Sequence, residues 1–190
     1  MPSSQTLSRT LAAVVALTAL AALARQARIA EGAATRPQGM PVWWWPAGCF
    51  TILTNCGMAP VVTAIAIGKR PSARLQGGLV RAIVLVGIVY HALLARLRAP
   101  QGLAWRADQG LHTATPVLMP GRWPRFGDRR ATPRDLRAWL AWPAIHATNA
   151  LVGGALADLW PYPFPDTDRQ GRTLPTRSVR QPVLIQQRPP

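Results

Sequence analysis

The apolar residues of this chain are gathered into long blocks, and this grouping limits the possible folds more than any other feature of the sequence. The blocks cover residues 10–24, 42–68, 78–94, 111–120 and 136–159. A helix that crosses a bilayer needs about 20 mostly apolar residues. Only 15% of the residues are charged, against about 25% in typical soluble domains. We therefore predict an all-α fold, a multi-pass transmembrane helical bundle with about five spans.

Two of the blocks allow a second interpretation. The first, Thr10–Ala24, ends in the small-x-small pattern of a signal-peptide cleavage site. We expect a transmembrane helix there instead, because further apolar blocks follow it. The fourth, Leu111–Pro120, is too short to cross a bilayer unless its helix starts near Leu103. That extension would bring the charged side chains of Arg106 and Asp108 into the span.

The basic residues and the tryptophans lie where a membrane protein would place them. Most of the 8 Trp residues lie at the edges of apolar blocks, as in interfacial belts. With the N-terminus inside, the inner loops receive the larger share of basic residues: Lys69, Arg70, Arg74, Arg122, Arg125, Arg129, Arg130 and Arg134. The sequence therefore predicts a bacterial inner-membrane protein whose partners are membrane lipids.

Other partners and cofactors are not expected. The net charge of +15 is compatible with nucleic-acid binding. However, the arginines lie between apolar blocks and do not line one helix face, so we expect no nucleic-acid partner. The three His residues are scattered and have no cluster of carboxylates, so we expect no metal site and no cofactor. The sequence carries no signal for an oligomeric state.

Two pairs of polar residues inside the apolar blocks could carry chemistry. Thr51 and Asn55 are four residues apart, as are Asp108 and His112, so each pair shares a helix face. A threonine hydroxyl becomes a nucleophile when a base takes its proton, and a carboxylate beside an imidazole supports such a base. Thr51 and His112 could form this pair if their helices pack together. The alternative is structural: Thr51 bonds to its own helix, Asn55 ties two helices together, and His112 bonds to a neighbouring carbonyl.

Five motifs in order resemble one family of membrane proteins. They are FTILTN, IVYHALL, ADQGLHTATPVL, WLAWP and WPYPF, and they extend over about residues 41–166. Together they resemble the bacterial relatives of the androgen-induced and androgen-dependent TFPI-regulating proteins. The resemblance implies a six-span bundle that hydrolyses fatty-acid esters of hydroxy fatty acids with an intramembrane threonine and histidine. By motif position, Thr51 and His112 match these two catalytic residues. From the spacing of the residues themselves, Asp108 could orient His112, and Asn55 or Thr54 could help to hold the oxyanion.

The sequence departs from the family pattern in two places. The apolar run after His112 stops at Pro120, where the helix is expected to end, and relatives continue hydrophobic. The family's sixth span is absent after Asp166, and a basic, Pro- and Arg-rich segment follows instead. We therefore expect a transmembrane domain over residues 1–165 and a disordered tail over residues 166–190. The expected function is a lipid-ester hydrolase; the alternatives are a non-enzymatic membrane protein or a truncated, inactive family member.

Overall fold

The part of the chain that the structure describes folds into five helical rods and contains no strand. This computed structural model describes residues 3–32, 49–97, 99–126 and 135–157. In chain order the elements are α1 (Ser4–Glu31), α3 (Phe50–Ala66), α4 (Ala73–Val89), the π-helical turn η1 (Tyr90–Leu94), the short 3-10 turn η2 (Ala95–Leu97), α5 (Gly102–Gln109), the π-helical turn η3 (Gly110–Ala114), α6 (Thr115–Phe126) and α7 (Leu136–Ala157). The predicted all-α fold is confirmed.

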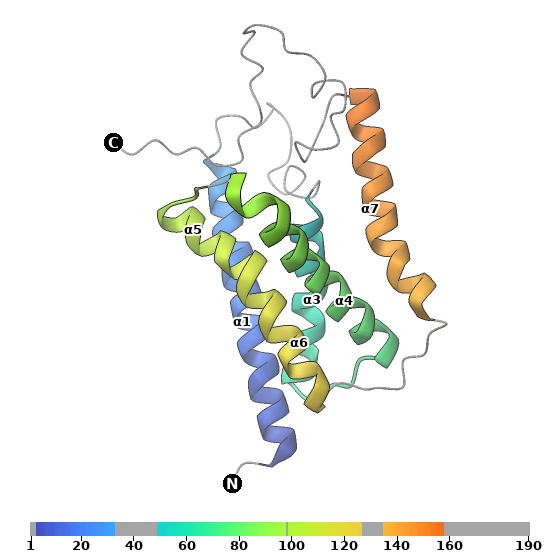
Figure 1. Cartoon of the computed structure of the whole chain (residues 1–190). Helices are drawn as coiled ribbons and strands as arrows, with labels where there is room; N and C mark the ends of the chain where they lie inside the picture. Colours follow the sequence, from blue (N-terminus) through green and yellow to red (C-terminus); the bar gives the residue numbers. More distant parts are fainter. Residues whose placement is uncertain (1–2, 33–48, 98, 127–134, 158–190) are drawn as a thin grey trace, which may run out of the picture.

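The rods pack side by side along their length (Figure 1). The blue helix α1 contacts α3 and the continuous yellow-green rod of α5, η3 and α6, while α4 packs between α6 and the orange helix α7. The N-terminal end of α1 meets the C-terminal end of α6, where the Arg122 guanidinium donates to the Ser8 hydroxyl over 3.0 Å. The two rods are therefore antiparallel.

Glycine allows the closest helix contacts in the bundle. A Cβ atom added to Gly110 would lie 2.5 Å from the Cβ of Ala22 on α1. A Cβ atom added to Gly87 on α4 would lie 2.8 Å from the Cβ of Pro116 on α6. Both distances are shorter than contact between carbon atoms allows. These two glycines therefore set how closely the central rod approaches α1 on one side and α4 on the other.

Replacing Gly110 with alanine is expected to destabilise the fold by about 1–3 kcal/mol, because neither methyl group can rotate away from the clash. The matched control is Gly121→Ala on α6, where an added Cβ meets no atom within 4 Å. That substitution should leave stability unchanged or raise it, because alanine favours a helix more than glycine does. Thermal unfolding followed by circular dichroism measures both. Equal melting temperatures for the two variants would contradict the close packing at Gly110.

The predicted boundaries need correction at three of the rods. The first helix is longer than the block Thr10–Ala24, since α1 covers 28 residues. The third begins earlier, at Ala73, where the Ser72 hydroxyl caps it by accepting from the Leu75 amide. The expected end at Pro120 is wrong, because α6 continues to Phe126.

Tertiary contacts explain why the helix continues through Pro120. A proline costs the helix one hydrogen bond and crowds the preceding turn, and packing can outweigh such a local preference. Met119 is buried in the core, and the Arg122 guanidinium is anchored to Ser8. Both contacts hold the residues that flank Pro120 against α1 and the core.

Several helices expose apolar side chains. Two of the described helices, α1 and the rod from Ala73 to Leu97, are long and apolar enough to cross a bilayer, and α3 is a shorter apolar helix. Neither long helix is mostly buried, because only 28% and 33% of their apolar windows lie inside the fold. Leu17 on α1, Ile88 on α4, Val117 on α6 and Ile145 on α7 are each more than 60% exposed.

The described residues do not include every predicted segment. The start of the second block, residues 42–48, and the motif WPYPF lie outside them. The same holds for the tail at residues 166–190 and for the position of a sixth span. The predictions made for these segments therefore stay predictions.

Candidate functional site

The centre of the candidate site is a widened helical turn that leaves one backbone carbonyl without a backbone donor. In the π-helical turn η3, the Thr115 amide bonds back five residues to the carbonyl of Gly110. The next residue is Pro116, which has no N–H to offer to the carbonyl of Leu111. A buried carbonyl without a donor is costly. The carbonyl of Leu111 must therefore be satisfied by side chains, and π-helical turns of this kind occur often at functional sites.

Asn55 on α3 and Thr115 on α6 supply the missing donors. The Thr115 hydroxyl lies 3.2 Å from the Leu111 carbonyl and 2.9 Å from Asn55 Oδ1. The Asn55 amide donates to the Leu111 carbonyl over 3.4 Å and to the Thr51 carbonyl over 2.9 Å. Asn55 and Thr115 are fully buried. This network joins the first turns of α3 to the turn that carries His112.

A second cluster surrounds His112 itself. His112 Nδ1 lies 3.2 Å from Asp108 Oδ1 and 3.1 Å from the Asp108 backbone carbonyl. The Tyr90 hydroxyl on η1 donates to Asp108 Oδ2. The Tyr90 ring stacks on the His112 ring, with 4.0 Å between the ring centroids. Tyr90 and Asp108 are buried, so the histidine ring is held on its face and at one nitrogen.

The arrangement defines which nitrogen of His112 can act as a base. Both atoms close to Nδ1 are oxygens of Asp108 that can only accept, so the proton belongs on Nδ1. Nε2 then carries the lone pair, and it makes no hydrogen bond with any residue that the structure describes. The side chain keeps 12% of its surface exposed. His112 Nδ1 is therefore held by a hydrogen bond to the Asp108 backbone carbonyl and by the 3.2 Å contact with the Asp108 carboxylate. An imidazole oriented at one nitrogen, with the other available, is the arrangement that general-base catalysis uses.

The structure brings Asp108 and His112 together, as predicted, but it shows no hydrogen bond between the side chains of Thr51 and His112 among the described residues. Asp108 and His112 form the predicted pair. Asn55 links the carbonyl of Thr51 to the carbonyl of Leu111, the residue before His112. The half-buried Thr51 makes no side-chain hydrogen bond with any described residue, and so none with His112. The two predicted catalytic residues therefore lie on helices that Asn55 connects, and no hydrogen bond joins their side chains in the part of the chain that the structure describes.

Sequence reasoning missed two members of these networks. Tyr90 lies in the motif IVYHALL and Thr115 follows His112 by three residues, but neither spacing indicates a contact across helices. Pro116 was the available signal for Thr115, because a proline after a polar residue in an apolar helix frees a carbonyl. No comparable signal pointed to Tyr90. His91, the residue after Tyr90, is exposed, and its Nε2 lies 3.1 Å from the Thr113 hydroxyl.

Neither a search for metal-binding groups nor a comparison with known proteins suggests a further function. Among the residues that the structure describes, no group of three or more His, Cys, Asp or Glu could hold a metal ion. No protein-family model, curated protein or solved structure matches the chain. The function must therefore be argued from the contacts described above.

Proposed function

We propose that this chain is a multi-pass membrane protein. The argument rests on the exposed apolar side chains of α1, α4, α6 and α7. A helix in a soluble bundle turns its apolar face to the core and its polar face to water. Here large apolar side chains lie on both the core and the outer surfaces, which suits a hydrocarbon environment. The two long apolar helices agree with this placement.

Within the membrane, the proposed activity is the hydrolysis of a lipid ester. The observation that carries this proposal is the orientation of His112 by Asp108 and Tyr90, which leaves Nε2 available inside a helical bundle. An ionisable pair at this depth is costly, so it favours a functional role. An ester with acyl chains is the substrate class that such an apolar site would accept.

The proposed reaction has two steps. His112 Nε2 takes the proton of the Thr51 hydroxyl while the oxygen of Thr51 attacks the ester carbonyl carbon. The ester C–O bond then breaks, and His112 returns the proton to the leaving alcohol. Water hydrolyses the acyl-threonine in the second step, again with His112 as the base. Asp108 orients His112, and Asn55 positions the backbone around both residues.

A non-enzymatic membrane protein is the second candidate. The observation that favours it is the absence of a hydrogen bond between the side chains of Thr51 and His112 among the described residues. In this alternative, the Asn55 and Asp108 networks only hold helices together, as polar residues in membrane bundles do. A truncated, inactive member of the family would likewise show no hydrolysis, and its polar networks would only hold helices together.

A fluorophosphonate probe distinguishes these candidates, because it labels only an activated hydroxyl. We expect the probe to label the wild-type chain at Thr51 and the Thr51→Ser variant, and to leave Thr51→Ala unlabelled. The matched control is Thr63→Ala on the same helix, where the hydroxyl donates to the Ala59 carbonyl; this variant should keep its label. Peptide mapping by mass spectrometry locates the adduct. A wild-type chain without label, or a label that persists in Thr51→Ala, would favour the non-enzymatic candidate.

A further inference from the structure

Three polar side chains form a second cluster on the outer surface of the bundle, beside the candidate site. His91 Nε2 on η1 lies 3.1 Å from the Thr113 hydroxyl on η3, and this hydroxyl donates to Gln109 Oε1 over 3.0 Å. His91 is exposed, and Gln109 and Thr113 are half-buried. None of the three makes a side-chain hydrogen bond to Asp108 or to the Leu111 carbonyl. We call these three residues the outer polar cluster.

The direction of the hydrogen bonds defines which atoms of the outer polar cluster can bind a ligand. The Thr113 hydroxyl has one hydrogen, which it gives to Gln109 Oε1, so the contact with His91 requires an N–H at Nε2. His91 Nδ1 then carries the lone pair of the neutral imidazole, and Gln109 Nε2 keeps two N–H groups. Neither nitrogen makes a hydrogen bond with a residue that the structure describes. The cluster therefore presents one acceptor and one donor to its surroundings.

The outer polar cluster lies next to the proposed base. Thr113 directly follows His112, so their Cα atoms are about 3.8 Å apart. The Tyr90 ring contacts both imidazoles: it stacks on His112, with 4.0 Å between the centroids, and meets the His91 ring edge to face, with 5.1 Å between the centroids. The two imidazoles thus flank one tyrosine ring. A ligand at His112 therefore needs only a short polar arm to reach His91 and Gln109.

The position of the cluster along its rod indicates the depth of the ligand in a bilayer. Trp105 lies four residues before Gln109 and is 52% exposed. Exposed tryptophan is typical of the membrane–water interface, and Gln109 lies about one helical turn, roughly 6 Å, further along the rod. In a bilayer, the ester bonds of lipids lie just below the headgroups and above the acyl chains. The cluster is therefore at the level of these ester bonds.

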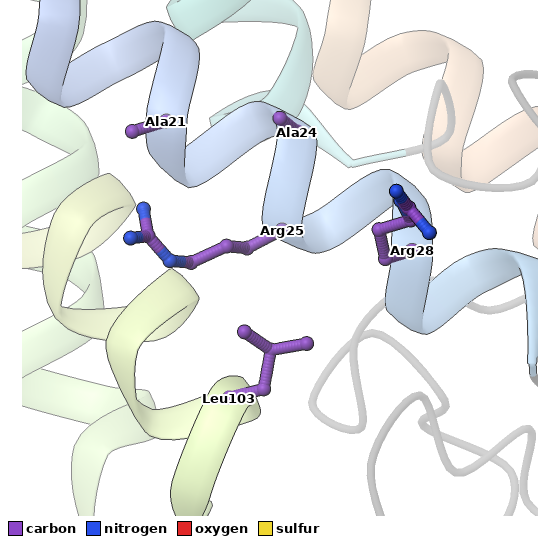
Figure 2. A pocket seen from close by; sticks show the side chains of 5 residues that line it. All are labelled: Ala21, Ala24, Arg25, Arg28 and Leu103. Carbon is purple, nitrogen blue, oxygen red and sulfur yellow. The ribbon is translucent and has the colours of Figure 1, made fainter.

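The hollow between α1 and the start of α5 is a poorer place for a polar ligand group. It is lined by Ala21, Ala24, Arg25, Arg28 and Leu103, and it is open to the outside. Figure 2 shows the guanidinium groups of Arg25 and Arg28 pointing to opposite sides, so the two arginines do not meet one ligand group. The outer polar cluster, by contrast, is ordered by its own hydrogen bonds.

An alcohol matches the atoms that the cluster presents. A hydroxyl donates one hydrogen bond and accepts others, so it can donate to His91 Nδ1 and accept from Gln109 Nε2. A plain alkyl group would leave both nitrogens without a partner, and a site built to bind a hydroxyl rejects an analogue that lacks it. In a monoacylglycerol, the free hydroxyls lie on the first and second carbons after the esterified one. Glycerol therefore supplies the short polar arm between His112 and the cluster.

We propose that the outer polar cluster binds a hydroxyl group on the alcohol part of the substrate, so that the ester hydrolysed is an acylglycerol. His91 and Gln109 are the specificity-determining residues, and Thr113 positions both. The proposal rests on the hydrolase activity argued above. It adds to that activity the class of the leaving alcohol.

The ratio of two kcat/KM values tests this proposal, because a ratio cancels any change in the amount of folded protein. The substrates are monooleoylglycerol and propyl oleate, which has the same carbons without the two hydroxyls, and the wild type should prefer the first by about 10-fold or more. Gln109→Met and His91→Phe should each lower this preference by about 3- to 10-fold, the usual effect of one hydrogen bond. Methionine keeps the length of glutamine, and phenylalanine keeps a ring beside Tyr90. The matched control is Gln101→Met before α5, which removes an exposed amide and should keep the wild-type preference.

The outcomes separate the hydroxyl site from the hydrolase activity. An equal preference in the wild type and in both variants, with hydrolysis intact, would overturn the hydroxyl site alone. A stronger preference for an ester with a carboxylate in its alcohol part, lost in Arg106→Gln, would overturn it as well, because the cationic neighbour three residues before Gln109 would then hold an anion.

A wild-type chain that hydrolyses neither ester would contradict the hydrolase activity, and binding then decides the hydroxyl site. Native mass spectrometry in detergent compares two ethers that cannot be hydrolysed, the hexadecyl ether of glycerol and hexadecyl propyl ether. The glycerol ether should bind about 10-fold more tightly, and Gln109→Met should remove most of this difference. Equal binding of the two ethers to the wild type would overturn the hydroxyl site.

Discussion

Replacing His112 with alanine is expected to lower kcat/KM for the hydrolysis of a fatty-acyl ester by about 10²–10⁴-fold, the usual contribution of a positioned general base. The base is lost because no other imidazole takes the place of Nε2: His91 bonds to Thr113, and the His146 ring packs against the Phe50 ring. The measurement is the release of a fluorogenic alcohol by purified protein in detergent. Turnover by His112→Ala at the wild-type rate would exclude this histidine as the base.

Graded substitutions around His112 separate a catalytic role from a structural one. Asp108→Asn and Tyr90→Phe should each lower kcat more than they raise KM, because both residues orient the base without touching the ester. Thr51→Ala combined with His112→Ala should cost no more than the larger single effect, since the two residues act in one step. The control is Thr63→Ala on α3, whose hydroxyl donates to the Ala59 carbonyl of its own helix and which should keep full activity. Additive losses for Thr51 and His112 would contradict a shared step.

Replacing the buried Asn55 with leucine is expected to destabilise the fold by about 2–3 kcal/mol. The substitution keeps the volume of the side chain but removes the hydrogen bonds to Thr51, Leu111 and Thr115. Buried polar groups that lose a partner cost about 1–3 kcal/mol. The measurement is chemical unfolding in one detergent. The control is Thr63→Val on the same helix, which removes only a bond to its own helix and should cost less than about 1 kcal/mol.

A second-site substitution tests the reason for this cost. Pro116→Ala restores an N–H that can reach the carbonyl of Leu111, and it keeps the Cβ atom that packs near Gly87. In the Pro116→Ala background, the cost of Asn55→Leu should therefore fall by about 1 kcal/mol, the usual net contribution of one hydrogen bond. An unchanged cost would show that Asn55 stabilises the helices by packing and not by serving the freed carbonyl.

Much of the helical framework could be predicted from the apolar blocks. The bounds of α7, Leu136–Ala157, nearly coincide with the predicted block 136–159, because an apolar run of this length is too long for an ordinary strand and favours a helix. The pairing of Asp108 with His112 also followed from the sequence. Residues four apart meet on any helix, so this contact needs no neighbouring element.

The sequence by itself therefore determined the helical class, the approximate position of the helices and the contacts made within one turn of helix. The tertiary structure alone decided the contacts between rods: Tyr90 with Asp108, and Asn55 with the carbonyl of Leu111. It also decided that α6 passes Pro120, because Met119 and Arg122 are held against other helices. The physical reason is that periodicity defines the face of a helix, whereas the neighbour of that face depends on how closely the rods approach. At Gly110 and Gly87, the helices approach closely because glycine has no side chain, and a Cβ atom at either position would clash with the neighbouring helix.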